Sequence, residues 1–433
     1  MKLFDTLKNI WKIEELKTRI LTTLGLILVY RLGTEIVLPG IDPHGLQALK
    51  DQTSSGVLGL LDMFSGGAFS NASVFALGIM PYISASIVVQ LLGIAVPYFQ
   101  RLQKEGESGR RKINQITRYL TLVILVLQGS AYLTNLKAQV PAEAFVSTGF
   151  WQFQLPSIVI MAAGSMFVLW LGERITDKGI GNGVSIIIMI GIIARLPFAF
   201  FAELTSRVSQ QGGGLVAFLI ELIILFLVFC GSILLVQGTR KVPVQYAKRI
   251  VGNKQYGGVR QYIPLKINAA GVMPIIFAST LCGLPNMIGS FLNLDATKHP
   301  YWTAFFRVFN YNSVLYLVVY VLLIVAFNYF YVAIQYNPVD ISNQLRKNNG
   351  TIPGIRPGKP TSDFITKTLS KITLIGAVFL AIVAAVPMII GDLTGVSIQL
   401  GGTSLLIIVG VALDTARSLE GYMTARHHKG FLE

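Results

Sequence analysis

Charged side chains are scarce in this sequence. Asp, Glu, Lys and Arg make up 13% of the 433 residues, whereas hydrophobic residues make up 53%. Uncharged apolar runs of membrane-spanning length recur along the chain, and no soluble core needs them. The composition therefore excludes an ordinary globular protein and predicts a polytopic membrane protein. Alternating strand patterns of the kind found in membrane barrels are also missing, so the spans should be helices.

Residues suited to catalysis or metal binding are few as well. The two cysteines, Cys230 and Cys282, both lie in apolar runs, which argues against a disulfide framework. The sequence has no GxxxxGK[ST] phosphate loop, no HExxH motif and no Cys/His metal spacing, and its spans lack the paired aspartates of an intramembrane protease. His427 and His428 are expected to be solvated. We therefore predict no catalytic residue, no cofactor and no metal, so energy for transport must come from a partner.

The middle of the apolar runs is almost free of ionisable residues. Glu221 and Asp414 lie nearer the ends of their runs, and Arg118 opens another run. An ion-coupled transporter is expected to carry such residues at mid-membrane, where they are costly and usually functional. Their absence weighs against that class and against a lipid or polymer flippase. A secondary transporter for an uncharged or peptide-like solute stays open as the main alternative.

Ten apolar runs are long enough to cross a bilayer core of about 30 Å. We place these spans at residues 20–38, 74–96, 119–136, 153–172, 181–202, 215–236, 268–290, 313–335, 372–390 and 402–419. Residues 1–19 carry cations among apolar side chains and predict an interfacial amphipathic helix that is retained, because no cleavage site follows it. Residues 420–433 form a tail.

Lys and Arg residues are distributed unevenly over the two sides of these spans. One side, with both termini and two large loops at residues 237–267 and 336–371, holds 29 of the 36, and the other side holds 7. The positive-inside rule makes the rich side cytoplasmic. A hinge loop at 203–214 divides the spans into five-helix halves, 20–202 and 215–419. With five helices in each half, the second half is inverted, which places the working site at the interface between halves.

The stretch before the second span is apolar but too short to cross the membrane. It covers residues 56–70 and is interrupted by Gly59, Gly66 and Gly67, which predicts a re-entrant segment. The second span contains Gly78 and Pro81. A helix distorted by these residues needs neighbours or water to satisfy its backbone, which indicates a cavity beside it.

Several motifs resemble those of one known family. GIMPYISAS, shortly after MFSGG, resembles the plug and second span of the SecY family of protein-conducting channels. Further motifs match in the same order at residues 106–113, 173–183, 264–274, 353–358 and 401–407. The resemblance implies an all-α polytopic fold, with ten transmembrane helices in two inverted halves around a central pore and a re-entrant plug helix. It also implies a channel that translocates unfolded secretory polypeptides across the bacterial cytoplasmic membrane and releases membrane segments laterally into it.

The resemblance implies a hydrophobic pore ring and a plug. The ring residues are Ile83, Ile87, Ile188, Ile276 and Ile407, with Val184 and Val272 as softer members, and the plug residues are Leu60, Leu61, Met63, Phe64, Ser65, Gly66 and Gly67. Periodicity alone would assign the aliphatic residues to helix packing or to lipid. An aliphatic collar suits a channel for many unfolded sequences, because it offers no charge or hydrogen bond that would hold any one of them. It also dewets when closed, which resists ion leakage.

Four polar residues in and beside these spans are candidates for the seam of a lateral gate: Ser84, Ser86, Gln90 and Asn268. A simple interhelical hydrogen bond is the alternative interpretation.

The two large loops suggest partners. The 237–267 loop has seven cations, no acid and three interleaved tyrosines, which suits RNA, an acidic protein or anionic lipid. Prolines stiffen the PGIRPG turn of the other loop. The resemblance implies that the ribosome and the SecA motor ATPase dock here, through Arg240, Lys241, Lys248, Arg249, Arg356 and Lys359. It also implies SecE, usually SecG, signal-bearing polypeptides and membrane lipids as partners.

Overall fold

The computed structural model describes residues 10–52, 56–209, 214–247, 249–251, 254–256, 260–292, 300–309, 313–394 and 402–429. The long helices are α2 (Glu14–Thr34), α5 (Met80–Ala95), α7 (Glu107–Gln139), α8 (Leu155–Lys178), α9 (Gly183–Ser209), α10 (Gly214–Gln237), α11 (Met273–Leu292), α13 (Val314–Gln335), α15 (Lys359–Thr394) and α16 (Gly402–Lys429). The shorter helices are α3 (Gln47–Gln52), α4 (Gly56–Phe64), α6 (Pro97–Lys104), α12 (Pro300–Val308) and α14 (Pro338–Lys347). We call α2 to α9 the first half and α10 to α16 the second half.

Six helical segments in the described part of the chain are long and apolar enough to cross a membrane. They are built around α7, α8, α9, α10, α13 and α15. The pair α5 and α6, bent by 98° at the break between them, adds a seventh if it counts as one span. The sequence predicts further spans at α2, α11 and α16. Of these, α11 has only a shorter apolar stretch, Met273–Gly283, and α2 begins at Glu14, inside the predicted interfacial helix.

The second span begins later than its hydrophobicity predicts. Residues 65–79 form turns, with positive φ values at Ala72 and Gly78, and helix α5 begins only at Met80. Pro81 therefore lies in the first turn of α5, where a missing N–H removes no helical hydrogen bond. The predicted distortion of a helix by Pro81 inside the second span is wrong for this reason.

The predicted hinge loop at 203–214 is mostly helical. Helix α9 continues through Ser209, and α10 begins at Gly214. Arg207 on α9 pairs with Glu203 one turn earlier (3.0 Å) and with Glu221 on α10 (2.6 Å). The largely buried Arg207–Glu221 pair links α9 to α10, at the point where the chain passes from the first half to the second.

The expectation of an all-helical chain is wrong at the first large loop. Strands β1 (Thr239–Tyr246) and β4 (Arg260–Lys266) pair antiparallel, and β2 (Arg249–Val251) pairs with β3 (Lys254–Tyr256). The short strand β5 (Gly350–Thr351) from the second loop joins the other edge of β1. Val242 and Val244 are buried between exposed neighbours, which is the two-residue period of a half-covered strand.

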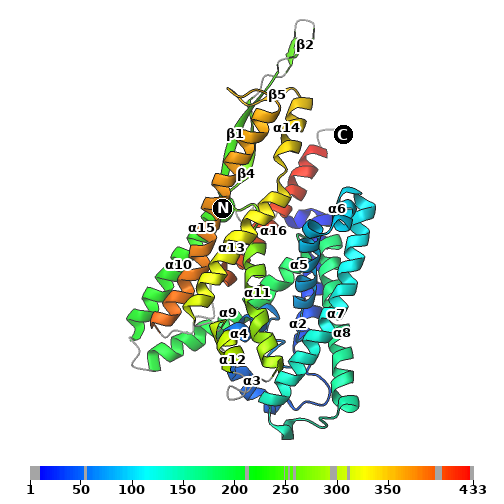
Figure 1. Cartoon of the computed structure of the whole chain (residues 1–433), viewed down its shortest axis with the longest axis vertical. Coiled ribbons are helices and arrows are strands. Elements are labelled where there is room, and N and C mark those ends of the chain that lie inside the picture. The colour runs from blue at the N-terminus through cyan, green and yellow to red at the C-terminus, as the bar shows by residue number, and fades with distance from the viewer. Residues whose placement is uncertain are drawn as a thin grey trace.

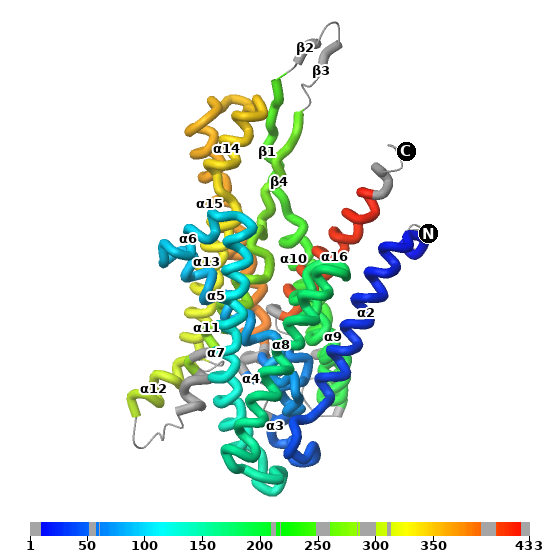
Figure 2. The backbone as a smooth tube through the Cα atoms, turned by 90° about the vertical axis from the view of Figure 1, so that its right-hand side faces the viewer, coloured from blue at the N-terminus to red at the C-terminus, as the bar shows by residue number. Residues whose placement is uncertain are grey.

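The two predicted loops form one folded unit at one end of the molecule. Apolar side chains of the hairpin, of α14 and of the start of α15 share one hydrophobic cluster: Val242, Val244, Leu265, Leu345, Ile352, Ile365 and Leu369. Figure 1 shows the hairpin and α14 at the end of the molecule opposite α3 and α12, and Figure 2 shows β1 and β4 running beside α14 at that end. The basic side chains are therefore carried on a folded support.

The largest buried cluster lies between the halves. It combines side chains from α2, α4, α5, α8 and α9 with side chains from α11, α13 and α16. Two further clusters lie mainly within one half each. The central cluster is therefore where the halves meet, and it contains the predicted ring.

Candidate functional site

The five predicted ring isoleucines come together in this central cluster. Ile83 and Ile87 project from α5, Ile188 from α9, Ile276 from α11 and Ile407 from α16, and none is more than 7% exposed. Val184 and Val272 are partly buried and pack against the same cluster. Isoleucines separated by more than 300 positions thus belong to one aliphatic cluster, and each half supplies them from two helices.

The predicted plug packs against the same cluster. Met63 and Phe64, at the end of α4, are buried in it, and Leu61 is partly buried against it. The Ser404 hydroxyl at the start of α16 lies 2.8 Å from the Met63 sulfur. Leu60 belongs to α4, but its side chain is outside the described residues. In Figure 1 α4 lies away from the β-hairpin, toward the end with α3 and α12.

The segment after α4 is held through its backbone carbonyls. We call residues 65–70 the plug foot. Tyr30 and Arg31 of α2 donate to the carbonyls of Ser65 (3.0 Å) and Gly66 (2.8 Å). Tyr132 of α7 donates to the carbonyl of Phe69 (2.8 Å). Gly66 and Gly67 have φ values of 68° and 91°, which glycine adopts without strain. Sequence reasoning predicted the plug but missed these tyrosines, whose polar ends need buried partners.

The predicted lateral-gate residues are only partly brought together. Ser84 donates to the carbonyl of Met80 in its own helix (3.1 Å), and Ser86 accepts from Gln90 (3.4 Å). The link between halves is instead made by Tyr331 of α13, whose hydroxyl donates to Gln90 Oε1. The ring of Tyr331 also lies 5.2 Å from that of Phe277. Helix α13 carries four tyrosines, and the sequence did not indicate which of them reaches the first half.

No hydrogen bond among the described residues joins Asn268 to the other three seam residues. It lies in the turn before α11, because the helix begins at Met273 rather than at residue 268. Its side chain is 7% exposed, and its Oδ1 has no hydrogen-bond partner among the described residues.

The predicted docking cations lie on the folded unit that the two loops form, which we call the hairpin unit. Arg240 and Lys241 are exposed on β1, and Arg356 and Lys359 are exposed at the PGIRPG turn and the start of α15. Lys248 lies outside the described residues, and Arg249 is in β2 with its side chain also outside them.

Two hydrogen bonds fix the PGIRPG turn. Thr361 donates to the carbonyl of Arg356 and Ser342 to that of Gly358, both at 2.8 Å. The turn therefore presents Arg356 from a defined backbone.

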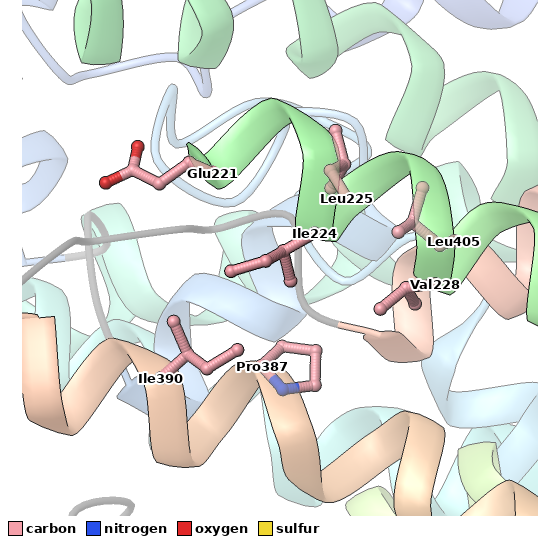
Figure 3. A pocket seen from close by; sticks show the side chains of 7 residues that line it. All are labelled: Glu221, Ile224, Leu225, Val228, Pro387, Ile390 and Leu405. Carbon is pink, nitrogen blue, oxygen red and sulfur yellow. The ribbon is translucent and has the colours of Figure 1, made fainter. Parts of the chain in front are cut away.

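A small cavity in the second half lies apart from the ring. Helices α10, α15 and α16 line it, mostly with aliphatic side chains (Figure 3). Glu221 stands at its edge and is already paired with Arg207. Because all the lining comes from one half, this cavity is not the interface between halves.

A sequence model of the SecY family matches residues 73–416. This chain belongs to the SecY family. Relatives named protein translocase subunit SecY extend over the whole chain. The one from Halalkalibacterium halodurans is 41% identical over 439 residues and covers 100% of both chains. The one from Streptomyces scabiei is 40% identical over 443 residues and covers 98% of both chains.

Solved structures show the SecY-family fold as well. A structure of a protein-conducting channel has a TM-score of 0.59 at 17% identity and covers 93% of this chain and 91% of that one. A second structure, reported for the role of the SecY plug domain in the closed channel, has a TM-score of 0.60 with the same identity and coverage. Sec61 in a canine ribosome–channel complex has a TM-score of 0.55. The fold is therefore shared along nearly the whole length.

Proposed function

We propose that this chain forms the pore through which unfolded secretory polypeptides cross the cytoplasmic membrane of a bacterium. As a member of the SecY family it is a protein-translocation channel subunit. The observation that carries the pore proposal is the aliphatic cluster between the two halves, in which the end of α4 is also buried. Family membership also argues against the alternative that composition left open, a secondary transporter for a small solute.

The ring suits this task by its chemistry. Isoleucine side chains offer dispersion contacts to any passing residue but no hydrogen bond or charge that would hold a particular one. In the closed state the same side chains exclude water, so a hydrated ion meets a dry barrier. We propose that Ile83, Ile87, Ile188, Ile276 and Ile407 seal the resting pore in this way.

The membrane arrangement that we propose has ten spans in two inverted halves. It adds α2, α11 and α16 to the segments that qualify by length and composition, and it counts α5 as one span. The distribution of Lys and Arg places both termini and the hairpin unit in the cytoplasm. Helix α4 is then a re-entrant plug on the outer side of the ring.

A lateral gate between α5 and α13 follows from the Gln90–Tyr331 contact. Hydrogen bonds between membrane helices contribute about 0.6 kcal/mol on average. Tyr331→Phe should therefore favour gate opening by about threefold, seen as tighter binding of a synthetic signal peptide to the detergent-solubilised channel.

The matched control for this variant is Tyr329→Phe on the same helix. The Tyr329 hydroxyl bonds to the carbonyl of Ser370, within the second half, at 3.5 Å. We expect unchanged signal-peptide binding for this control. Equal effects of both variants would contradict a gate role for Tyr331.

Partners follow from the basic hairpin unit and from the family. We propose that Arg240, Lys241, Arg356 and Lys359, together with Lys248 and Arg249, dock the ribosome and the SecA motor. One related structure holds Sec61 with a ribosome and another holds the yeast Ssh1 complex on a ribosome, which supports the first of these partners. SecE and SecG are the proposed companion subunits, with signal-bearing polypeptides and membrane lipids as the other contacts.

The test of the pore is whether a polypeptide halted in transit touches the ring. Contacts from ring positions on both halves support the proposal. Absence of such contacts, combined with saturable uptake of a small solute, would restore the transporter alternative.

A further inference from the structure

One guanidinium group connects the end of α4 to the plug foot. Arg195 of α9 forms an ion pair with Asp62 in the last turn of α4, and the same Arg195 nitrogen donates to the Ser70 hydroxyl at 2.7 Å. The Asp62 carboxylate also accepts the backbone N–H of Ser70 at 2.7 Å. Asp62 is buried, with 5% of its side chain exposed, whereas 36% of Arg195 is exposed.

Arg195 can reach this carboxylate because Gly67 has no side chain. A Cβ at Gly67 would lie 2.9 Å from two nitrogens of Arg195. The function assigned to the plug and to the ring uses neither Arg195 nor Asp62. A buried carboxylate whose charged partner comes from another helix is nevertheless expensive to separate from that partner.

The attachments of α4 and its foot to the two halves differ in kind. Tyr30, Arg31, Tyr132 and Arg195, all in the first half, hold the foot or the last turn of α4 by hydrogen bonds or by charge. Among the described residues, the hydrogen bond toward the second half runs from Ser404 to the Met63 sulfur, which is a weak acceptor. The remaining contact with second-half ring members is apolar and has no directional preference.

We propose that Arg195 is the positioning residue that holds the plug against the pore ring. Through its bonds to Asp62 and Ser70, Arg195 sets the angle between α4 and the plug foot. When the halves separate, the foot stays with the first half and the end of α4 leaves Ile276 and Ile407. This inference rests on the proposed plug function of α4.

The experiment measures the resting state of the reconstituted channel in two ways. The first is ion conductance in planar bilayers, and the second is maleimide labelling of Met63→Cys in a Cys230→Ser, Cys282→Ser background. Met63 is 8% exposed at rest, so faster labelling reports that the end of α4 has moved out of the central cluster. For Arg195→Gln and Asp62→Asn we expect conductance and labelling rate to rise roughly tenfold, because each variant breaks a pair with a buried member.

The double variant Asp62→Asn, Arg195→Gln separates positioning from folding. It leaves no unpaired buried charge, so thermal stability should recover toward the parent while conductance and labelling stay raised. Arg195→Lys, which keeps the charge but loses the forked geometry, should fall between parent and Arg195→Gln. Arg111→Gln, which breaks an exposed pair with Glu107 on α7, should leave both resting-state readouts unchanged.

Two results would overturn the proposal. In the first, Arg195→Gln has parental conductance and labelling while deletion of residues 60–69 does leak, so the plug seals without Arg195. In the second, the double variant regains both stability and a tight seal, so the pair only supports the fold. If the variant lacking residues 60–69 shows no leak, the proposed plug function of α4, on which this inference rests, would itself be wrong.

Discussion

Deleting residues 60–69 should open the resting channel to ions. The deletion removes Met63 and Phe64 from the central cluster, and loss of a large buried side chain costs about 2–5 kcal/mol. That energy favours the closed pore, so its loss should raise the open fraction by more than about tenfold. The measurement is single-channel conductance of purified protein in planar bilayers, without any translocating substrate.

A smaller change gives the matched comparison for this deletion. Phe64→Ser keeps the chain length and the foot contacts but removes most of the apolar contact of one plug residue. We expect a leak between that of the parent and that of the deletion. Val146→Ser, at a side chain that is 88% exposed outside the cluster, should behave as the parent. Parental conductance in the deletion variant, with normal protein levels, would refute the plug function.

Reversing the charge of Arg356 should nearly abolish motor-driven export. Arg356 is exposed on a turn that two hydrogen bonds hold in place, so Arg356→Glu changes the presented charge without a packing loss. Attraction to an acidic partner then becomes repulsion, and the translocation rate should fall at least about tenfold. The assay is ATP-dependent translocation of a secretory polypeptide into proteoliposomes that contain the channel and the motor.

Two controls distinguish docking from folding in that experiment. Lys50→Glu on α3, exposed at the opposite end of the molecule, should leave export unchanged. The level of membrane-inserted Arg356→Glu channel should equal that of the parent. Equal export by the two charge-reversed variants, at equal levels, would rule out Arg356 as a docking residue.

Hydrophobicity predicted the positions of most spans, because charge-free runs of that length have few other uses. It misplaced the start of the second span, since residues 71–79 are as apolar as a helix but turn at Ala72 and Gly78. The β-hairpin was missed because its seven cations dominate the local composition. The alternation around Val242 and Val244 was the available strand signal, over only a few residues.

The candidate site was predictable as a set of residues but not as a geometry. Motif resemblance selected the five isoleucines, whereas periodicity could not distinguish a pore face from a lipid face. The polar contacts of Arg195 and Tyr331 were not predictable, because their partners lie 133 and 241 positions away in the chain. Such pairings depend on which spans become neighbours, and a single sequence carries no direct record of that.

The most direct measurement of pore function is photocrosslinking from the ring to a stalled, signal-bearing polypeptide. A photoreactive residue would replace Ile83 in one variant and Ile276 in another, so that each half carries one probe. A third variant with the probe at Leu322, which is 62% exposed on α13, controls for contact from the lipid side. Soluble peptide without a signal serves as the substrate control.

A polypeptide that passes through the ring should give adducts at both Ile83 and Ile276. Neither the Leu322 probe nor the soluble peptide should give any. Absence of adducts at both ring positions, with saturable uptake of a small solute into the same proteoliposomes, would contradict a polypeptide-conducting pore between the two halves.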